Sequence, residues 1–195
     1  MFSLIVAVDK NKGIGIKNQL PWRLKKDMAF FKKLTMSVYP SEVLQKYGLS
    51  FKSNSKIEDR EKELQGQNAV IMGRKTWESI PAKFRPLPNR VNIVLSRQSL
   101  VLPQGVLLAH SLDEALKLSS NNKHTFVIGG ANIYQQALEH CECQTLYVTK
   151  VNHSFNCDAF FPAFEKDFEL QQESEGYEEE SLSFCFQVWK REGVG

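Results

Sequence analysis

Short apolar runs rich in β-branched residues alternate along this chain with amphipathic stretches, and this alternation limits the possible folds most strongly. It is typical of parallel strands linked by helices, that is, of an α/β domain. The run Val91–Leu95 is apolar at nearly every position, which indicates a strand buried on both faces of a sheet. The predicted strands are Leu4–Val8, Ala69–Met72, Val91–Leu95, Gly105–Ala109, Thr125–Ile128, Thr145–Val151, Phe168–Glu173 and Leu182–Lys190; the predicted helices are Leu24–Thr35, Thr76–Ile80, Leu112–Ser119 and Ala131–Glu139.

The last predicted strand differs from the others, because a turn-prone acidic stretch precedes it and Phe184, Phe186 and Val188 alternate with less apolar neighbours. That pattern favours an antiparallel hairpin at the edge of the sheet. With 195 residues, the chain is long enough to bury one continuous core. We therefore predict a single α/β domain over residues 1–195, with a mostly parallel, twisted sheet of about eight strands, an antiparallel C-terminal edge hairpin and about four flanking helices.

The segment 36–68, between the first helix and the second strand, does not follow this alternation and is long for a connection in a compact domain. It contains Pro40, Gly48, Gly66 and a charged run at 56–63. We expect it to be a surface insertion that includes some helix.

Composition and the first residues exclude several classes of protein. The net charge of +3 is too small to argue for nucleic acid, although it suits a pocket that collects phosphates and carboxylates. The apolar run at 2–8 lacks the flanks of an export signal, and no apolar stretch is long enough to span a membrane. In a protein that stays in the cytoplasm, the four cysteines should be reduced. The spacing of Cys141 and Cys143 matches no usual zinc site, so we expect no metal.

Two segments near the N-terminus carry candidate chemistry. Gly13-Ile14-Gly15 alone fits a flexible loop better than a dinucleotide fingerprint, but Leu20-Pro21-Trp22 follows it and should place a ring with one N–H donor at the mouth of a cleft. On the next helix, Asp27 shares a face with Phe31, Leu34 and Thr35. A charged acid on such a face is costly unless it is paired. Asp27 either turns aside to cap its helix or waits in a cleft for a ligand that donates hydrogen bonds.

Three predicted strand ends suit phosphate groups. Gly73-Arg74-Lys75-Thr76 opens a helix, Ser96-Arg97 follows the next strand, and Gly129-Gly130 separates a buried strand from a helix. Helix N-termini attract phosphate, and ligands of open α/β sheets gather at the carboxyl ends of the strands. Each feature alone also fits a solvated basic pair or a plain tight turn.

Together and in this order, the segments resemble the dihydrofolate reductase family over nearly the whole chain apart from 36–68. The matching pieces are Ile5-Val6-Ala7, Gly13-Ile14-Gly15, Leu20-Pro21-Trp22, Asp27 to Thr35, Met72 to Pro81, Arg85-Pro86-Leu87, Arg90, Leu95-Ser96-Arg97, Ile128-Gly129-Gly130, Tyr134, Thr149 and Asp158 to Pro162. Any one piece could be accidental, whereas the ordered set is highly specific. Asp27 and Met28 depart from vertebrate members, which carry glutamate and an aromatic residue there.

The resemblance implies an enzyme that reduces dihydrofolate to tetrahydrofolate by hydride transfer from NADPH. Asp27, Trp22 and Thr149 are the implied catalytic residues, with Asp27 accepting hydrogen bonds from the pterin and Arg90 binding the α-carboxylate of the glutamate tail. A water is implied as the courier of the proton to N5. The residues implied to line the folate site are Ile5, Val6, Met28, Phe31, Ile80, Leu87 and Arg90.

The implied cofactor site has three parts. The nicotinamide amide would be held by Ala7 and Ile14. The pyrophosphate would be held by Thr76 and the Gly130-Ala131 end. The 2′-phosphate would be held by Arg74, Ser96 and Arg97. The family also has a cis peptide between the two glycines, here Gly129 and Gly130, and a loop, here Gly13–Gln19, that closes over the nicotinamide. The full set of implied cofactor contacts is Ala7, Ile14, Gly15, Gly73, Arg74, Lys75, Thr76, Ser96, Arg97, Ile128, Gly129, Gly130, Ala131 and Tyr134.

Other functions stay open at this stage. We expect a cytoplasmic monomer that binds dihydrofolate, folate and antifolates and needs neither membrane nor nucleic acid. A reductase domain fused to thymidylate synthase is one alternative. A second alternative is a noncatalytic nucleotide- or RNA-binding module, and a third is a reductase for another pterin or pyrimidine. Neither of these two explains Asp27 together with Arg90 and Thr149.

Overall fold

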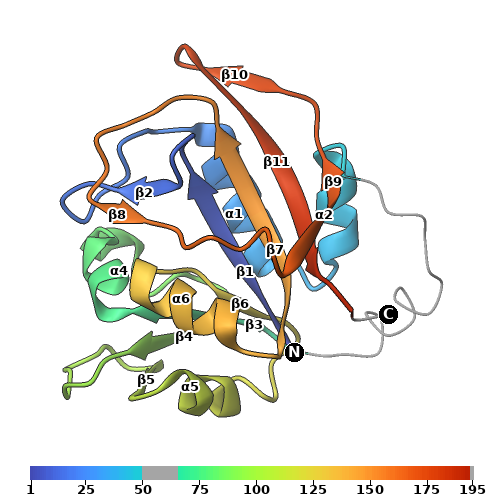
Figure 1. Ribbon diagram of the computed structural model, residues 1–195. Coiled ribbons are helices and arrows are strands. Elements are labelled where there is room, and N and C mark those ends of the chain that lie inside the picture. The colour runs from blue at the N-terminus through green and yellow to red at the C-terminus, as the bar shows by residue number, and fades with distance from the viewer. Residues whose placement is uncertain (50–65, 194–195) are drawn as a thin grey trace.

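The apolar runs form the centre of one sheet in the computed structural model, which describes residues 1–49 and 66–193 (Figure 1). Their pairings are all parallel, in the spatial order β7-β1-β6-β3-β4-β5. The strands are β1 (Phe2–Val8), β3 (Asn68–Gly73), β4 (Arg90–Leu95), β5 (Val106–Ala109), β6 (Thr125–Val127) and β7 (Cys143–Val151). Every residue of β3 and β6 is buried, as expected for strands covered on both faces.

The antiparallel end of the sheet is built around β11 (Leu182–Arg191), which pairs with β7 on one side. On its other side it pairs with β9 (Phe168–Glu173) and β10 (Tyr177–Glu179). The predicted C-terminal hairpin at the sheet edge is thus confirmed. The last strand itself is internal, however, because the outer positions belong to β9 and β10.

Two short strands that the sequence analysis did not predict form a separate small sheet. β2 (Gly13–Gly15) pairs antiparallel with β8 (Ala159–Phe160), which lies far away in the sequence. This pairing gives the glycine-rich loop after β1 a defined path instead of leaving it a free connection.

The four predicted helices are present, with all their ends within two residues of the expected ones. They are α1 (Lys25–Met36), α4 (Arg74–Ser79), α5 (Leu112–Leu118) and α6 (Ala131–Glu139). A further helix, α2 (Pro40–Lys46), lies in the predicted insertion, where some helix was expected. A 3-10 turn, Ala82–Phe84, follows α4. The rest of the insertion, 50–65, lies outside the described residues.

The helices cover both faces of the sheet, α5 and α6 on one and α1 and α2 on the other (Figure 1). Strand β1 shows how the two faces divide. Leu4, Val6 and Val8 pack into the cluster under α5 and α6, while Ile5 packs into the cluster under α1 and Ala7 lies against that second cluster. None of the helices in the described ranges is long and apolar enough to cross a bilayer.

The parallel pairing brings the carboxyl ends of β1, β6, β3 and β4 to one edge of the sheet. The segments beginning at Asp9, Ile128, Arg74 and Ser96 leave the sheet at this edge. Ligands of open α/β sheets bind outside such an edge, so the predicted site residues meet where a ligand site is expected.

Candidate active site

Asp27 lies in the first turn of α1 and is buried, with 7% of its surface exposed. Its Oδ1 accepts a hydrogen bond of 2.7 Å from the hydroxyl of Thr149 on β7. Burial raises the pKa of Asp27 to about 6, the Thr149 bond opposes that rise, and the negative charge of Glu179 adds to it. The side chain therefore turns into the protein rather than aside to cap its helix.

The strand register explains why Thr149 meets this acid. Thr149 pairs with Ala7 of β1, and Ile5 pairs with Tyr147, so Ile5 and Ala7 share the face of the sheet that looks toward α1. The buried hydroxyl of Tyr134 donates a hydrogen bond of 2.8 Å to the Ile5 carbonyl oxygen. The strand beside the acid is thereby held from α6 as well.

An apolar wall extends from the acid. Five residues of the predicted site are partly buried against the cluster under α1: Ala7, Phe31, Ile80, Leu87 and Ile128. Asn92 holds Leu87 there, with its side-chain amide bonded at 2.9 Å both to the N–H and to the carbonyl oxygen of Leu87. The sequence analysis missed Asn92, whose polarity inside a buried strand was the available signal.

Two predicted wall residues are placed differently from that wall. Met28 is 51% exposed, although Asp27 before it is buried. Val6 packs into the cluster on the opposite face of the sheet from Ile5. Its side chain does not reach the wall, because neighbouring residues of a strand point to opposite faces.

Trp22, which we expected at the mouth of a cleft, is buried, with 6% of its surface exposed. Its ring packs against Phe155, with the ring centroids 5.3 Å apart. The buried Nε1 has no hydrogen-bond partner among the described residues. A buried donor left in this state costs free energy, so this N–H suits an acceptor brought by a bound water or ligand.

Arg90 is a second buried charge, 7% exposed at the start of β4. Its Nη1 donates to Thr35 Oγ1 at 2.7 Å and its Nε to the Pro88 carbonyl oxygen at 3.0 Å. Burial lowers the pKa of Arg90 to about 10. None of the ion pairs among the described residues includes this guanidinium. A buried cation without an anion is costly, so the arrangement suits a ligand carboxylate.

Thr35, which orients Arg90, is itself held firmly. Its hydroxyl donates to the Phe31 carbonyl oxygen at 2.7 Å, and Asn68 Nδ2 donates to the Thr35 carbonyl oxygen at 3.0 Å. The sequence analysis placed Thr35 on the face of Asp27 but gave it no role, and it missed Asn68. Only the contact across 55 residues shows that Thr35 serves Arg90.

The opposite part of the site has two helix N-termini with glycine caps. Gly73 precedes α4 and Gly130 precedes α6, and neither helix has a side-chain cap, whereas α5 is capped by Ser111. The Gly73 N–H donates to the Gly129 carbonyl oxygen at 2.7 Å, which ties the two starts together. The implied cis peptide between Gly129 and Gly130 is present.

The glycines keep this space open. A Cβ at Gly129, whose φ is +120°, would lie 3.2 Å from the ring of Tyr134, and one at Gly130 would lie 3.3 Å from Thr76 Oγ1. Uncapped N–H groups beside such a cradle fit a diphosphate. The residues present therefore suit the pyrophosphate of a dinucleotide.

The predicted phosphate-binding cations surround the same edge. Arg74 forms an ion pair of 3.4 Å with Glu78 one turn along α4. Ser96 and Arg97 line a hollow of about 150 Å³, together with His110, Ser111, Ile133 and Gln136. His110, which sequence reasoning missed, bonds the Ser96 carbonyl oxygen through Nδ1 at 2.9 Å.

The loop after β1 is fastened over this edge. Lys17 N donates to Asp158 Oδ2 at 2.8 Å, and Asp158 N donates to the Gly15 carbonyl oxygen at 3.0 Å. The Asn18 side chain reaches the Lys75 carbonyl oxygen at 2.9 Å. Ile14 and Gly15, both predicted to contact the cofactor, are therefore held between β8 and α4.

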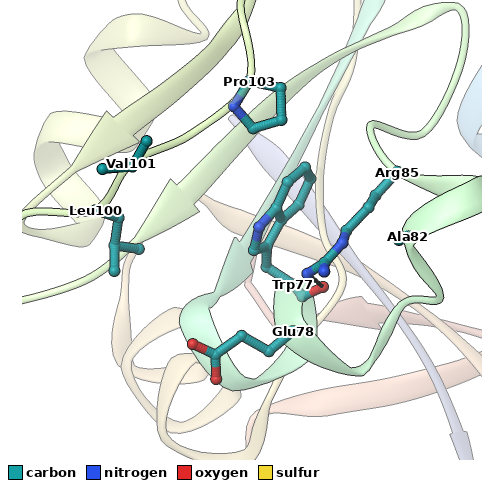
Figure 2. A pocket seen from close by; sticks show the side chains of 7 residues that line it. All are labelled: Trp77, Glu78, Ala82, Arg85, Leu100, Val101 and Pro103. Carbon is teal, nitrogen blue, oxygen red and sulfur yellow. Dashed lines mark hydrogen bonds between the residues drawn. The ribbon is translucent and has the colours of Figure 1, made fainter.

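A larger hollow of about 430 Å³ lies beside α4, outside the predicted site (Figure 2). Trp77 faces it, and Arg85 donates through Nη1 to the Trp77 carbonyl oxygen at 3.0 Å. Figure 2 shows the Glu78 carboxylate pointing away from that guanidinium. These contacts anchor α4, whose first residues lie at the edge predicted to bind the cofactor.

The raised pKa of Asp27 makes a prediction about stability. Folded protein keeps a proton that the unfolded chain releases between about pH 4 and pH 6, so folding weakens as the pH rises through this window, by about 3 kcal/mol in total. Asp27→Asn should therefore raise the free energy of unfolding by about 2–3 kcal/mol near pH 8 and by little near pH 4, in urea titrations. The exposed Asp167→Asn is the control, and a gain independent of pH would contradict the prediction.

Comparison with known proteins agrees with this geometry. A family model described as dihydrofolate reductase matches residues 1–39 and 59–191. The dihydrofolate reductase of Heliothis virescens is 39% identical over 97% of this chain and 96% of that protein. That of Drosophila melanogaster is 38% identical over 97% of each chain. The bifunctional dihydrofolate reductase-thymidylate synthase of Daucus carota is 34% identical over 97% of this chain but 34% of its own length. The chain belongs to the dihydrofolate reductase family.

Proposed function

We propose that this chain reduces 7,8-dihydrofolate to 5,6,7,8-tetrahydrofolate with NADPH, in the service of one-carbon metabolism and of thymidylate and purine synthesis. Family membership supports the reaction. The observation that carries the proposal is the buried acid Asp27, which forms no ion pair among the described residues and lies beside the apolar wall of Phe31, Ile80 and Leu87. A pterin brings the ring N–H and amino donors that such an acid lacks.

Asp27 holds and polarises the pterin. Thr149 occupies Oδ1, so Oδ2 is left to accept from the ring N3 and 2-amino groups, and Thr149 lies beside the same amino group. In a low-dielectric pocket, a carboxylate favours a cationic ring, so Asp27 promotes protonation at N5. The unpartnered Trp22 Nε1–H holds the water that carries this proton. NADPH, when bound, supplies the hydride for C6.

Arg90 binds the glutamate tail. A guanidinium has five N–H donors, and two of those of Arg90 donate hydrogen bonds to Thr35 and Pro88. The remaining donors can form a bidentate pair with the α-carboxylate. Phe31, 5.9 Å from the guanidinium, lines the benzoyl region with Ile80 and Leu87. We assign Ile5 and Met28 to the pterin and benzoyl region as well, and Val6 through its backbone.

The residues that would hold the cofactor lie along the strand ends. Ala7 and Ile14 hold the nicotinamide amide, and Gly15 and the fastened loop exclude bulk water. Thr76 and the uncapped start of α6 at Ala131 hold the pyrophosphate. The residues assigned to the adenosine 2′-phosphate and its surroundings are Arg74, Lys75, Ser96 and Arg97. We assign Tyr134 a supporting role, because its ring packs beside Gly129 and its hydroxyl donates a hydrogen bond to the Ile5 carbonyl oxygen.

The alternatives make weaker use of the same residues. A noncatalytic nucleotide- or RNA-binding module needs no buried acid, and a reductase for a pterin without a glutamate tail needs no buried Arg90. A reductase domain joined to thymidylate synthase stays a second candidate, because the carrot protein with that name matches 97% of this chain. We expect the chain to act in the cytoplasm as a monomer and to bind folate and antifolates competitively.

The direct test follows NADPH oxidation spectrophotometrically. The wild type should oxidise NADPH only when dihydrofolate is present, and methotrexate should stop it. Asp27→Asn should lose about 100-fold or more of this activity at neutral pH and regain part of it in acid, where the substrate is protonated by the solvent. If Asp27→Asn kept full activity at neutral pH, Asp27 would have no part in the chemistry.

A second prediction concerns Arg90. Arg90→Leu should raise KM for dihydrofolate by about 100-fold, because the tail carboxylate loses its partner, and should leave KM for NADPH within about twofold. A substrate analogue without the glutamate tail should bind the variant and the wild type equally. Loss of affinity for both ligands would instead indicate misfolding.

A third prediction concerns the choice of cofactor. Arg97→Ala should raise KM for NADPH by about tenfold and leave the slow reaction with NADH unchanged, because NADH lacks the phosphate that Arg97 binds. Lys117→Ala removes a charge of the same sign from the nearby helix α5 and is the control. Equal losses with both cofactors would take Arg97 out of the 2′-phosphate site.

A further inference from the structure

Helix α1, which carries Asp27, begins without a cap of its own. The residue at its N-cap position is Leu24, whose side chain forms no cap hydrogen bond. The cap comes from Glu179, 154 residues further along the chain: its Oε1 accepts from Lys25 N at 2.6 Å and its Oε2 from Lys26 N at 3.1 Å. A carboxylate here satisfies two free N–H groups and complements the helix dipole. Asp27 is the next residue.

The strand that carries Glu179 is firmly attached to its surroundings. Glu179 ends β10 and pairs with Leu182 of β11. Two residues earlier on the same face, the Tyr177 ring lies 3.7 Å from Lys26 Nζ, and its hydroxyl donates to the Tyr47 carbonyl oxygen at 3.3 Å. The hairpin therefore contacts the first turn of α1 at two points and the end of α2 at a third.

The same hairpin is joined to the strand that carries the partner of Asp27. In β11, Phe186 pairs with Thr149 of β7, and Phe186 packs against Tyr177 with the ring centroids 5.4 Å apart. The cap from Glu179 and the Thr149–Asp27 bond thus belong to one connected unit. The cap sets where the first turn of α1 stands relative to β7.

Glu179 also contributes the negative charge in this environment. Thr149 from β7 donates a hydrogen bond to Asp27, and the ionisable groups that interact with it electrostatically are Glu179 from β10, Tyr47 after α2 and Tyr134 from α6. Burial raises the pKa of both tyrosines, so they stay neutral in the working range. The N–H groups of Lys26 and Lys25, with the charges of both side chains, lower the pKa of Glu179 and keep it ionised.

We propose that Glu179 is a positioning residue for the reaction: its carboxylate caps α1 from the β10–β11 hairpin and holds Asp27 against Thr149. This role rests on the proposed function of Asp27. Glu179 itself touches neither the substrate nor the cofactor in the proposed arrangement.

The test compares Glu179→Gln and Glu179→Ala with Glu178→Gln, which removes the same charge from an exposed residue of the same strand. A carbon-13 titration of the Asp27 carboxyl in the protein without ligands should show the midpoint about 0.5 pH unit lower in Glu179→Gln than in the wild type. Glu178→Gln should leave the midpoint unchanged. The difference should shrink in 1 M salt, because Glu179 lies at the surface.

Kinetics supply the second measurement. In the wild type, kcat/KM for dihydrofolate should decline as the pH rises through the Asp27 midpoint. In Glu179→Gln this decline should begin at a lower pH, in step with the lower midpoint. Glu179→Ala, which also loses the cap, should lower kcat by about tenfold further, with KM for NADPH unchanged. Unchanged midpoints in Glu179→Gln, with only a loss of stability in Glu179→Ala, would overturn the proposal. A wild type inactive with dihydrofolate would overturn the proposed function instead, and the titration would still decide the role of Glu179.

Discussion

The burial of one carboxylic acid between α1 and β7 is the constraint on which the arrangement of the site depends. Among the described residues, the Asp27 carboxylate receives a single hydrogen bond, and the buried cation Arg90 has no carboxylate partner. The two could pair, but α1 prevents it. Asp27 and Thr35, the partner of Arg90, are eight residues apart on that helix, which corresponds to about 12 Å along its axis.

This separation explains the chemistry of the ligand. A molecule that completes both charges must present hydrogen-bond donors at one end and a carboxylate at the other, with an apolar middle against Phe31, Ile80 and Leu87. Dihydrofolate has that polarity. The two unpaired buried charges destabilise the free protein. A ligand that pairs with both charges removes this destabilisation, so it binds more tightly.

Much of the fold could be predicted because buried parallel strands and amphipathic helices each have a local pattern. The bounds of β9 and α6 were predicted at both ends. The short strands β2, β8 and β10 were not, because two or three residues carry no periodicity and these strands exist only through pairing with distant segments. The burial of Trp22 was not predicted, because ring size and polarity do not show how much of a ring other residues cover.

The site could be predicted only as far as its motifs are local. A helix start is predicted within a few residues by each of two motifs, Gly73 to Thr76 and Gly129-Gly130. Thr35, Asn68 and Glu179 have partners 33 to 154 residues away, so no spacing in the sequence reveals them. These residues hold the groups that are proposed to contact the ligands, and that task depends on tertiary contact rather than on pattern.

Helix α4 shows how the two halves of the site are kept in register. Its first residues, from Arg74, lie at the edge proposed to hold the cofactor, and Ile80, directly after its end, belongs to the wall proposed to line the folate site. Six helical residues span about 9 Å, so the helix is a short, stiff spacer between the two proposed ligand sites. Trp77 is a residue of this helix and its side chain is buried. Arg85 donates a hydrogen bond to the Trp77 carbonyl oxygen, so the helix cannot easily rotate. Hydride transfer depends on close alignment of two rings, and a rigid spacer preserves that alignment better than a loop.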